Sequence, residues 1–474
     1  MNRFKNYING RSVGFLGLGV SNLPIAELLS KMGETVVIRD KKAPAELGER
    51  ALALVEKGVR FVSGETCFES IDEDIIFRSP GIRPDIEGLQ TARARGAEVT
   101  SDIELLLDFS GAKSFAVTGS DGKTTTTTLT GRFLEEYANS RGASAFIGGN
   151  IGVPLLTRYH EMRSDDYLVL ELSSFQLMSV TKAPENIAIT NITPNHLDWH
   201  GEMGEYIEAK KRIIGRATKR VVVNFENQIT RDIGISAAGE GKQVIFFSSK
   251  VKSAEEILSA VPEGCLAVWE RDGDIVISDG QSESALLSVA SIRVPGRHNV
   301  ENFMTAIALT YGVVPVETYK TVADSFFGVP HRLEWVRSID GVDYYNSSID
   351  SSPTRTAAAL SALNGRDIVV ICGGYDKKIP YEPLADALYK YARAVVLTGA
   401  TRDKIGRAIE TCDAGKSKAL TVAVEPEFAD AIKRAKALAR EGGCVLLSPA
   451  SASFDAFKNF AERGDRFKRI VSEL

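Results

Sequence analysis

Short apolar runs alternate along the chain with longer stretches in which apolar and polar residues are mixed. The runs are rich in Val, Ile, Leu and Phe, a composition typical of buried strands. The stretches between them are compatible with helices, several of them rich in Ala and Leu. Such alternation is typical of parallel sheets covered by helices, so the pattern predicts an α/β protein.

The same pattern divides the chain into three α/β blocks, covering residues 1–110, 111–328 and 329–474. A length of 474 residues also exceeds what one core usually supports. Residues 271–274 read Arg-Asp-Gly-Asp, a hairpin signal that predicts a small antiparallel piece in the second block. The predicted strands are 13–19, 35–40, 75–82, 166–171, 186–192, 220–224, 244–247, 342–345, 367–371, 394–397 and 444–447, and helices are predicted at 21–31 and 206–214.

Composition and charge exclude several classes of protein. The net charge is −5, so no overall basic field attracts nucleic acid or membrane surfaces. No apolar run has the length of a membrane span, and residues 1–10 lack the apolar core of a signal peptide. The 5 cysteines have no paired spacing. They are interpreted as reduced thiols without a zinc site, which predicts a cytoplasmic protein.

The strongest chemical signal is a glycine-rich loop between a predicted strand and a helix-compatible stretch. Residues 119–124 read Gly-Ser-Asp-Gly-Lys-Thr. Backbone N–H groups of such a loop surround a phosphate, Lys123 reaches the β/γ-phosphates and the Thr124 hydroxyl can bind Mg²⁺. The first glycine of a full P-loop is replaced by Val117. The loop therefore predicts ATP binding, the alternative being a strand-to-helix turn without a ligand.

A second glycine turn opens the first block. Gly17 and Gly19 follow a predicted strand, and Asp40 ends the next strand at the spacing of a ribose-binding acid. The third glycine of the dinucleotide fingerprint is replaced by Asn22, which weakens the case for NAD. The turn is suited to a nucleotide phosphate. The alternative is an ordinary turn at the end of a strand, without a ligand.

Oxygen-bearing and histidine side chains in the second block suggest a metal site. Glu171 ends a predicted strand, and His196 follows another by a short loop. A zinc hydrolase would need His-Glu-x-x-His on a helix, which the sequence lacks. Mg²⁺ held by Thr124, Glu171 and nucleotide phosphates fits better, with His196 as a further ligand or as a capping or core histidine.

Several motifs, in order, resemble those of the ATP-dependent Mur ligase family. They span most of the chain and are specific in combination; they comprise residues 118–125, 149–152, 171–177, 196–201 with Lys210, 296–302 and 331–334. Residues 17–21, 79–82 and 447–464 most resemble members of the family that use D-glutamate.

The resemblance implies a reaction. ATP phosphorylates the carboxylate of UDP-N-acetylmuramoyl-L-alanine, and the amine of D-glutamate displaces phosphate from the acyl phosphate. This would be a cytoplasmic step of peptidoglycan precursor synthesis, by a monomer that binds small molecules and neither nucleic acid nor membrane. Residues 1–110 would be a Rossmann-like UDP-substrate domain, 111–328 a P-loop-type ATP and Mg²⁺ domain with a mostly parallel sheet, and 329–474 a Rossmann-like D-glutamate domain.

The resemblance also implies residue roles. Lys123, Glu171, His196 and Lys210 would be catalytic, with one or two Mg²⁺ held by Thr124, Glu171, His196 and Lys210. ATP would contact Gly119, Gly122, Lys123, Thr124, Thr125, Asn299 and Arg332. The UDP substrate would contact Val20, Ser21, Asp40, Lys41, Gly81 and Asn150, and D-glutamate would contact Ser351, Lys377, Ser453, Phe454 and Phe460.

Lys210 carries an unusual implication, because the lysine matching it in the family is carbamylated. Addition of CO₂ turns a cation into an anionic oxygen ligand suited to Mg²⁺. From the sequence alone, the alternative is a solvated lysine like its neighbour Lys211.

Three positions depart from the family pattern. Asp121 stands where Asn is usual, so its charge is expected to be offset by Mg²⁺ or to point outward. Ser347 and Ile349 replace an Asp and a Lys of the third block, and Asp350 is a candidate to compensate for the first of these replacements.

Four other functions compete with this interpretation. A sibling ligase for a third amino acid would lack the segment from Ser453 to Phe460, and a folylpolyglutamate synthase would lack the first block. An NAD-dependent oxidoreductase would rest on Gly17, Gly19 and Asp40 alone and leaves the ATP loop unexplained. A non-catalytic nucleotide-binding protein would keep the loop without turnover.

Overall fold

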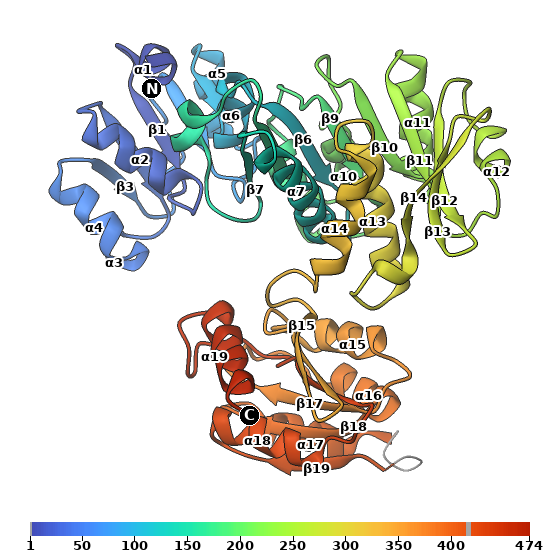
Figure 1. Ribbon diagram of the computed structural model, residues 1–474. Helices are drawn as coiled ribbons and strands as arrows, with labels where there is room; N and C mark the ends of the chain where they lie inside the picture. The colour runs from blue at the N-terminus through green and yellow to red at the C-terminus, as the bar shows by residue number, and fades with distance from the viewer. Residues whose placement is uncertain (1, 414–418) are drawn as a thin grey trace. The chain divides into compact units, whose positions relative to one another are not determined.

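A computed structural model describes residues 2–413 and 419–474, and within these ranges the chain forms three mostly parallel sheets with helices (Figure 1). The predicted α/β class is confirmed. The chain divides into two compact units, one of residues 1–291 with 300–322 and the other of residues 292–299 with 323–474.

The first sheet, in the first unit, has the strand order β3-β2-β1-β4-β5, and every neighbouring pair is parallel. Its strands are β1 (Val13–Leu16), β2 (Val36–Asp40), β3 (Arg60–Ser63), β4 (Ile75–Arg78) and β5 (Glu98–Thr100). The helices of this region are α1 (Asn2–Ile8), α2 (Asn22–Lys31), α3 (Pro44–Leu47), α4 (Glu49–Glu56), α5 (Glu87–Ala94) and α6 (Asp102–Phe109).

The second sheet belongs to the same unit and has the order β14-β13-β12-β11-β10-β9-β6-β8-β7. Its strands are β6 (Lys113–Thr118), β7 (Ala145–Gly149), β8 (Tyr167–Glu171), β9 (Asn186–Ile189), β10 (Arg220–Asn224), β11 (Gln243–Phe247), β12 (Leu266–Arg271), β13 (Asp274–Ser278) and β14 (Glu283–Ser288). The accompanying helices are α7 (Lys123–Asn139), η1 (Leu156–Glu161), α8 (Ser174–Leu177), α9 (Leu197–His200), α10 (Met203–Lys211), α11 (Gln228–Gly239), α12 (Ala254–Leu258) and η2 (Val289–Ser291). The strands β12, β13 and β14 pair antiparallel, which confirms the predicted hairpin.

The third sheet, in the second unit, has the order β15-β16-β20-β17-β18-β19. Its strands are β15 (Glu334–Ile339), β16 (Val342–Asn346), β17 (Ile368–Gly373), β18 (Ala392–Thr398), β19 (Thr421–Val424) and β20 (Cys444–Leu447). Its helices are α15 (Pro353–Ala362), α16 (Glu382–Tyr391), α17 (Arg402–Thr411), α18 (Phe428–Leu438) and α19 (Phe460–Ser472). Helices α13 (Arg297–Thr310) and α14 (Val316–Ser325) precede this sheet in the chain.

Several predicted elements have different bounds in the structure. The strands predicted at 13–19 and 75–82 end at Leu16 and Arg78, where the chain enters the turns after β1 and β4. The strand predicted at 186–192 ends at Ile189, because the next residues turn toward the phosphate loop: the Thr190 hydroxyl donates to the carbonyl of Asp121 at 2.5 Å, and the Asp121 N–H donates to the Asn191 side chain at 2.9 Å. The helix predicted at 206–214 instead covers Met203–Lys211, with Glu202 as its N-cap directly after Gly201, whose φ is 75°.

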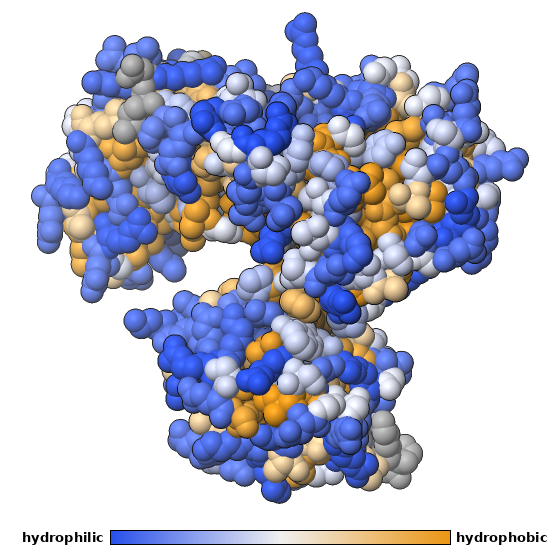
Figure 2. All heavy atoms as spheres, viewed as in Figure 1, coloured by the Kyte–Doolittle hydropathy of each residue, from blue (hydrophilic) through white to orange (hydrophobic). Residues whose placement is uncertain are grey.

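The apolar runs supply the cores, as the pattern predicts. The central strands β1, β4, β8, β17 and β20 are buried at every position. Figure 2 shows hydrophilic residues over most of the visible face, with smaller hydrophobic areas between them. Among the described residues, no helix combines the length and apolarity that a membrane span requires.

Candidate functional site

The phosphate loop joins β6 to α7, which runs along the sheet beside β6, β7 and β8 (Figure 1). Two glycines let it turn: Gly119 has φ 149° and Gly122 has φ 78°, both in the region that favours glycine. A Cβ on Gly119 would overlap the Thr190 hydroxyl, and one on Gly122 would overlap the Asn302 amide. The two glycines therefore let the loop pack closely against Thr190 and Asn302, directly at the N-terminus of α7.

Lys123 begins α7 and lies over the loop. Its Nζ donates to the carbonyls of Gly119 at 2.9 Å and Ser120 at 2.8 Å. The Ser120 hydroxyl is hydrogen-bonded to the Tyr206 hydroxyl at 2.9 Å, which ties the loop to α10. The ammonium group thus lies at the loop, where a nucleotide phosphate would need a cation. Thr124 and Thr125 follow in the first turn of α7.

Glu171 lies at the end of β8, beside the phosphate loop. Strand β8 pairs with β6, with Glu171 opposite Val117, so the carboxylate emerges at the same sheet edge as the loop. One oxygen, Oε1, accepts from the Asn150 amide at 2.7 Å. The other, Oε2, is buried and has no hydrogen-bond partner within the described chain. A buried carboxylate oxygen without a donor is costly unless a cation binds it.

Lys210 reaches the same place from α10. Its side chain is 1% exposed, and its Nζ donates to the carbonyl of Gly119 at 2.7 Å. Burial, and secondarily the charge of Lys123, lowers the pKa of Lys210 to about 7. The solvated-lysine alternative is therefore wrong: Lys210 is buried, whereas Lys211 is exposed and paired with Glu208.

His196 lies in an exposed turn before α9, with left-handed φ 54°. Its ring packs edge-on against Phe175 at 5.0 Å, and the partial desolvation of the ring, followed by the charge of Lys123, lowers its pKa. Phe175, Trp199 and His200 complete what we call the aromatic cluster, with Phe175 stacked on His200 at 5.5 Å. The His200 ring is held by Ser174 at 2.9 Å and Glu205 at 3.1 Å.

The donor set suits Mg²⁺ better than a softer metal. Within the described ranges, no group of three or more His, Cys, Asp and Glu side chains could hold a metal by itself. Mg²⁺ is commonly held by one or two carboxylates plus substrate phosphates and water. The partnerless Oε2 of Glu171, beside a phosphate loop, fits that coordination.

The glycine turn of the first sheet is organised by Asp40. Its carboxylate accepts from the Leu18 N–H at 2.8 Å and from the Lys42 N–H at 3.0 Å. The buried Asn22, where the fingerprint has glycine, donates to the carbonyls of Gly17, Leu16 and Phe77. Asn22 thus joins the ends of β1 and β4, a role that the sequence analysis missed. The available signal was a polar side chain next to the apolar residues at the start of a helix.

The other residues predicted to hold the UDP substrate lie around this turn. Val20 is 78% exposed, and Ser21 is the residue before α2, where its side chain makes no capping hydrogen bond and interacts with the buried Asp102. The exposed Lys41 pairs with Glu65 at 2.6 Å. Gly81 lies in the exposed loop after β4. Asn150 lies apart from them, at Glu171.

In the second unit, residues predicted to bind D-glutamate gather at the ends of β16, β17 and β20. The Lys377 ammonium donates to the Ser351 hydroxyl at 3.1 Å. Ser453 is buried, and the neighbouring Ala452 pairs with Tyr375 in a bridge. Phe454 is 64% exposed and its ring meets Tyr375 at 6.1 Å. Phe460 packs against His331 at 5.9 Å.

Arg463 supports this group of loops; the sequence placed it in the segment 447–464 but assigned it no role. It is buried and donates to the carbonyls of Ser348, Ser451 and Ala452, the last at 3.0 Å. Burial lowers its pKa to about 10. Its place in the segment 447–464, directly before Gly464, was the available sequence signal.

The two predicted ATP contacts of the second unit lie in separate segments. The buried Asn299 donates to the carbonyl of Pro295 at 2.6 Å. Arg332 follows His331, whose φ of 65° is left-handed. The buried Asn346 joins this segment through His331 at 3.1 Å and Glu334 at 2.9 Å.

The departures from the family pattern have local explanations in two of three cases. Ser347 is buried and accepts from the Leu333 N–H at 3.1 Å, so it fixes the segment before β15. Asp350 points into the core, where it accepts from Ser448 at 2.8 Å, and burial raises its pKa to about 6. Asp121 is exposed, as the outward-pointing alternative requires. Nothing in the structure explains Ile349.

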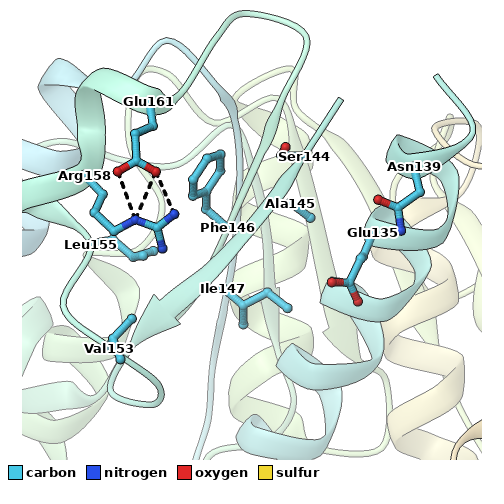
Figure 3. Close-up of a pocket in the computed structure, with 10 residues that line it drawn as sticks. All are labelled: Glu135, Asn139, Ser144, Ala145, Phe146, Ile147, Val153, Leu155, Arg158 and Glu161. Carbon is cyan, nitrogen blue, oxygen red and sulfur yellow. Dashed lines mark hydrogen bonds and ion pairs between the residues drawn. The ribbon is translucent and has the colours of Figure 1, made fainter. Parts of the chain in front are cut away.

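A separate pocket of about 450 Å³ lies beside the edge strand β7 (Figure 3). It is lined by residues of α7, β7 and η1, and its charged wall is the pair Arg158 and Glu161 at 2.6 Å. No predicted site residue lines it.

Comparison with known proteins shows two family matches. Residues 117–310 match the Mur ligase middle domain, and residues 331–451 match the Mur ligase glutamate ligase domain. The chain is 41% identical over 479 residues to the UDP-N-acetylmuramoylalanine–D-glutamate ligase of Acetivibrio thermocellus, covering 100% of this chain and 99% of that protein. It is 41% identical over 476 residues to the ligase of the same name from Clostridium botulinum, again covering 100% and 99%.

Solved structures agree on the fold. The UDP-N-acetylmuramate–alanine ligase of Thermotoga maritima matches with a TM-score of 0.54 at 19% identity, over 98% of this chain and 100% of that one. The MurF protein of Acinetobacter baumannii matches with a TM-score of 0.53 at 18% identity, over 80% and 81%.

Proposed function

The chain belongs to the Mur ligase family, and we infer that it is an ATP-dependent ligase that joins D-glutamate to UDP-N-acetylmuramoyl-L-alanine. The γ-phosphoryl group passes to a carboxylate oxygen of the alanine, and ADP leaves. The D-glutamate amine then attacks the acyl carbon, a C–N bond forms, the C–O bond to phosphate breaks, and the amine loses a proton. Phosphorylation is needed because a free carboxylate is a poor electrophile.

One observation carries the inference: Lys123, Lys210 and the partnerless oxygen of Glu171 meet at the phosphate loop. Transfer of a phosphoryl group needs little covalent help and much neutralisation of charge. The N-terminus of α7 and the Lys123 ammonium provide it for the phosphates. An oxidoreductase has no use for this arrangement, and a passive nucleotide-binding protein does not need a buried lysine beside it.

We propose that Thr124, Glu171, His196 and Lys210 hold one or two Mg²⁺ ions. The bound metal would neutralise the phosphate oxygens and the acyl oxygen. Asn150 orients the carboxylate of Glu171 through its amide, which leaves Oε2 for the metal. This hydrogen bond supports a role for Asn150 in orienting a metal ligand, in addition to the proposed contact with the UDP substrate.

Carbamylation of Lys210 belongs to the same proposal. A neutral amine attacks CO₂, a C–N bond forms and a proton is released, so the cation becomes an anion. Burial supports this step, because a Lys210 with 1% exposure is poorly stabilised as a cation and has no carboxylate partner among the described residues. A Glu171 oxygen nearby also favours a metal bridging the two groups.

We propose that the nucleotide sugar binds to the first unit and D-glutamate to the second. We propose that Val20, Ser21, Asp40, Lys41 and Gly81 hold the UDP part, and that Ser351, Lys377, Ser453, Phe454 and Phe460 hold D-glutamate. Asn299 and Arg332 would contact ATP. A cation with adjacent hydroxyls suits a dicarboxylate, as the Lys377 and Ser351 pair supports.

The domain boundaries 1–110, 111–328 and 329–474, a monomeric state and a cytoplasmic location are part of this proposal. The separate sheets support the domain division.

The test is release of phosphate from ATP in the presence of UDP-N-acetylmuramoyl-L-alanine. D-Glutamate is compared with L-glutamate, L-lysine and diaminopimelate. Release that depends on D-glutamate, with ligated product identified by mass, is expected. Release that requires a different amino acid would overturn the assignment. Absorbance at the nicotinamide wavelength, with NAD added, checks the oxidoreductase alternative and is expected to stay constant.

A further inference from the structure

Two arginines, Arg78 and Arg83, flank the exposed loop that carries Gly81. Arg78 is the last residue of β4 and is 1% exposed. Arg83 lies just after the loop, and its side chain is 32% exposed. Each makes hydrogen bonds near the loop and also to a segment that follows a strand of the second sheet, β8 for Arg78 and β9 for Arg83.

Arg78 draws the loop carbonyls inward. Its Nη1 donates to the carbonyls of Ser79 at 3.3 Å, Pro80 at 3.3 Å and Ile82. The carbonyl and the following N–H of one peptide unit point in opposite directions. The N–H groups of Gly81 and Arg83 therefore face away from the guanidinium. Within the described chain, no acceptor is recorded for the Gly81 N–H.

The other side of the same guanidinium holds the segment after Glu171. Nη2 donates to the carbonyl of Phe175 at 2.9 Å and to the Ser179 hydroxyl at 2.7 Å. Among the described residues, Arg78 has no carboxylate partner; its hydrogen bonds go to carbonyls and to a hydroxyl. A buried cation without a counter-ion lies behind an outward-facing N–H, which favours an anion on the outer side.

Arg83 holds the segment after His196. It donates to the carbonyl of Trp199 at 2.7 Å and to both oxygens of Glu205, at 3.1 Å and 2.9 Å. Its guanidinium also lies 5.0 Å from the centre of the Trp199 ring. Asp85 pairs with it at 2.8 Å and orients it.

The two anchor points meet in the aromatic cluster. Phe175, whose carbonyl binds Arg78, has its ring 4.6 Å from Trp199 and 5.0 Å from His196. Movement of either arginine is thus transmitted by direct contact to the proposed metal ligand His196. The same contacts would fix the loop relative to Glu171, three residues before Ser174.

Resting on the proposed ligase function, we propose that Arg78 and Arg83 are positioning residues for the nucleotide-sugar substrate. They hold residues 79–82 as a turn in which the Ile82 N–H is bonded to the Ser79 carbonyl, so that the N–H groups of Gly81 and of the following Arg83 are left to face the substrate diphosphate. They also keep that turn in register with the segments that carry Glu171 and His196. The acyl group of the bound substrate is thereby placed at the phosphate loop.

The experiment compares Arg83→Ala, Arg83→Lys and Arg78→Lys with the control Arg50→Ala. Arg50 pairs with Glu27 through two hydrogen bonds at 2.8 Å and 2.7 Å, an ion pair of similar form on α4 and α2. Full-length proteins are assayed for the three KM values and for thermal unfolding. Calorimetry measures the Kd of UDP-N-acetylmuramoyl-L-alanine without ATP, which needs no turnover.

Loss of charge-assisted hydrogen bonds in Arg83→Ala is expected to raise the KM and Kd of the nucleotide sugar about tenfold. The KM of D-glutamate and the Tm are expected to match those of Arg50→Ala. Arg83→Lys should recover part of the loss, because it keeps a cation. Arg78→Lys keeps the buried charge, but an ammonium cannot span both anchor points, so the Kd should again rise.

The proposal is overturned if Arg83→Ala and Arg78→Lys bind the nucleotide sugar as the control does. It is equally overturned if all three KM values change together with the Tm, since that would indicate general loss of structure. Failure of the wild-type protein to use D-glutamate counts against the proposed function alone, because the calorimetric Kd still tests the arginines.

Discussion

The side chains of Lys210, in the first unit, and Lys377, in the second, lie in very different environments. Lys210 lies 1% exposed at the phosphate loop, bonded to a carbonyl, with its pKa lowered to about 7 mainly by burial. Lys377 is exposed in a loop of the second unit and donates to the Ser351 hydroxyl. Burial makes the first unstable as a cation and therefore reactive as an amine, whereas the second is exposed to solvent and to an arriving ligand. The first location is suited to covalent modification and the second to binding a carboxylate.

The same contrast holds for the polar atoms around them. At the phosphate loop, a buried Glu171 oxygen has no partner in the described chain. In the loops of the second unit, Arg463 donates to three backbone carbonyls, those of Ser348, Ser451 and Ala452. At the phosphate loop, the buried Glu171 oxygen needs a cation as its partner, whereas the three carbonyls bound by Arg463 already have their donor.

The largest effect is expected from Lys210→Ala. Removing a group that stabilises transition-state charge typically lowers kcat by about 10²–10³. Lys211→Ala, one residue along α10, removes an exposed lysine and should leave kcat near the wild-type value. With ¹³C-labelled bicarbonate, a carbamate signal is expected in the NMR spectrum of wild type and Lys211→Ala but not of Lys210→Ala. A signal that persists without Lys210 would contradict the proposed modification.

Lys377→Gln is expected to act on binding. Loss of one charge-assisted hydrogen bond of about 1.5–3 kcal/mol should raise the KM of D-glutamate roughly ten- to a hundredfold. The value of kcat at saturation should change much less. Lys378→Gln removes the neighbouring exposed charge and is the matched control. Equal KM values of D-glutamate for the two variants would show that Lys377 does not bind this substrate.

Asp350→Asn, in the second unit, is expected to change the free energy of unfolding in a pH-dependent way. Burial raises the folded-state pKa of Asp350 to about 6, above its value in the unfolded chain. The folded protein thus binds the proton more tightly, so the stability this carboxyl contributes is present below about pH 4 and is lost as pH rises through about 6. Asn can still accept from Ser448 and carries no charge.

The variant is therefore expected to be more stable than wild type at pH 7.5, by about 2 kcal/mol, and to lose that advantage near pH 4. Urea unfolding at both pH values measures this. A gain that is the same at both would show that Asp350 does not titrate as described.

Asp121→Asn is expected to give the smallest effect. The Asp121 side chain is exposed and lies near Lys210, whose pKa it raises against the larger effect of burial. Interactions between exposed charges are weak and screened, so the KM of ATP should change by less than about threefold. Initial rates at varied ATP and two salt concentrations measure it. A larger change would mean that Asp121 contacts the nucleotide or its metal.

Much of the architecture could be predicted from local pattern. Buried strands such as Arg220–Asn224 and Cys444–Leu447 coincide with the predicted segments, because a strand covered on both faces is apolar at its central positions. The hairpin at 271–274 was equally readable from its turn residues. Boundaries failed where a distant contact overrides local preference, as at Ile189, where Thr190 and Asn191 turn to bind the loop of Asp121.

For the site, the sequence determined which chemical groups are present and their order: the loop at 119–124, Glu171, His196 and Lys210. It could not determine their environment, because burial depends on what the rest of the chain packs around a side chain. Lys210 and Lys211 are adjacent in sequence, and only the tertiary structure decides that one is buried against Gly119 and the other is solvated. Likewise, only the pairing of β6 with β8 leaves a Glu171 oxygen without a donor, and only folding brings Arg78 and Arg83 to the aromatic cluster.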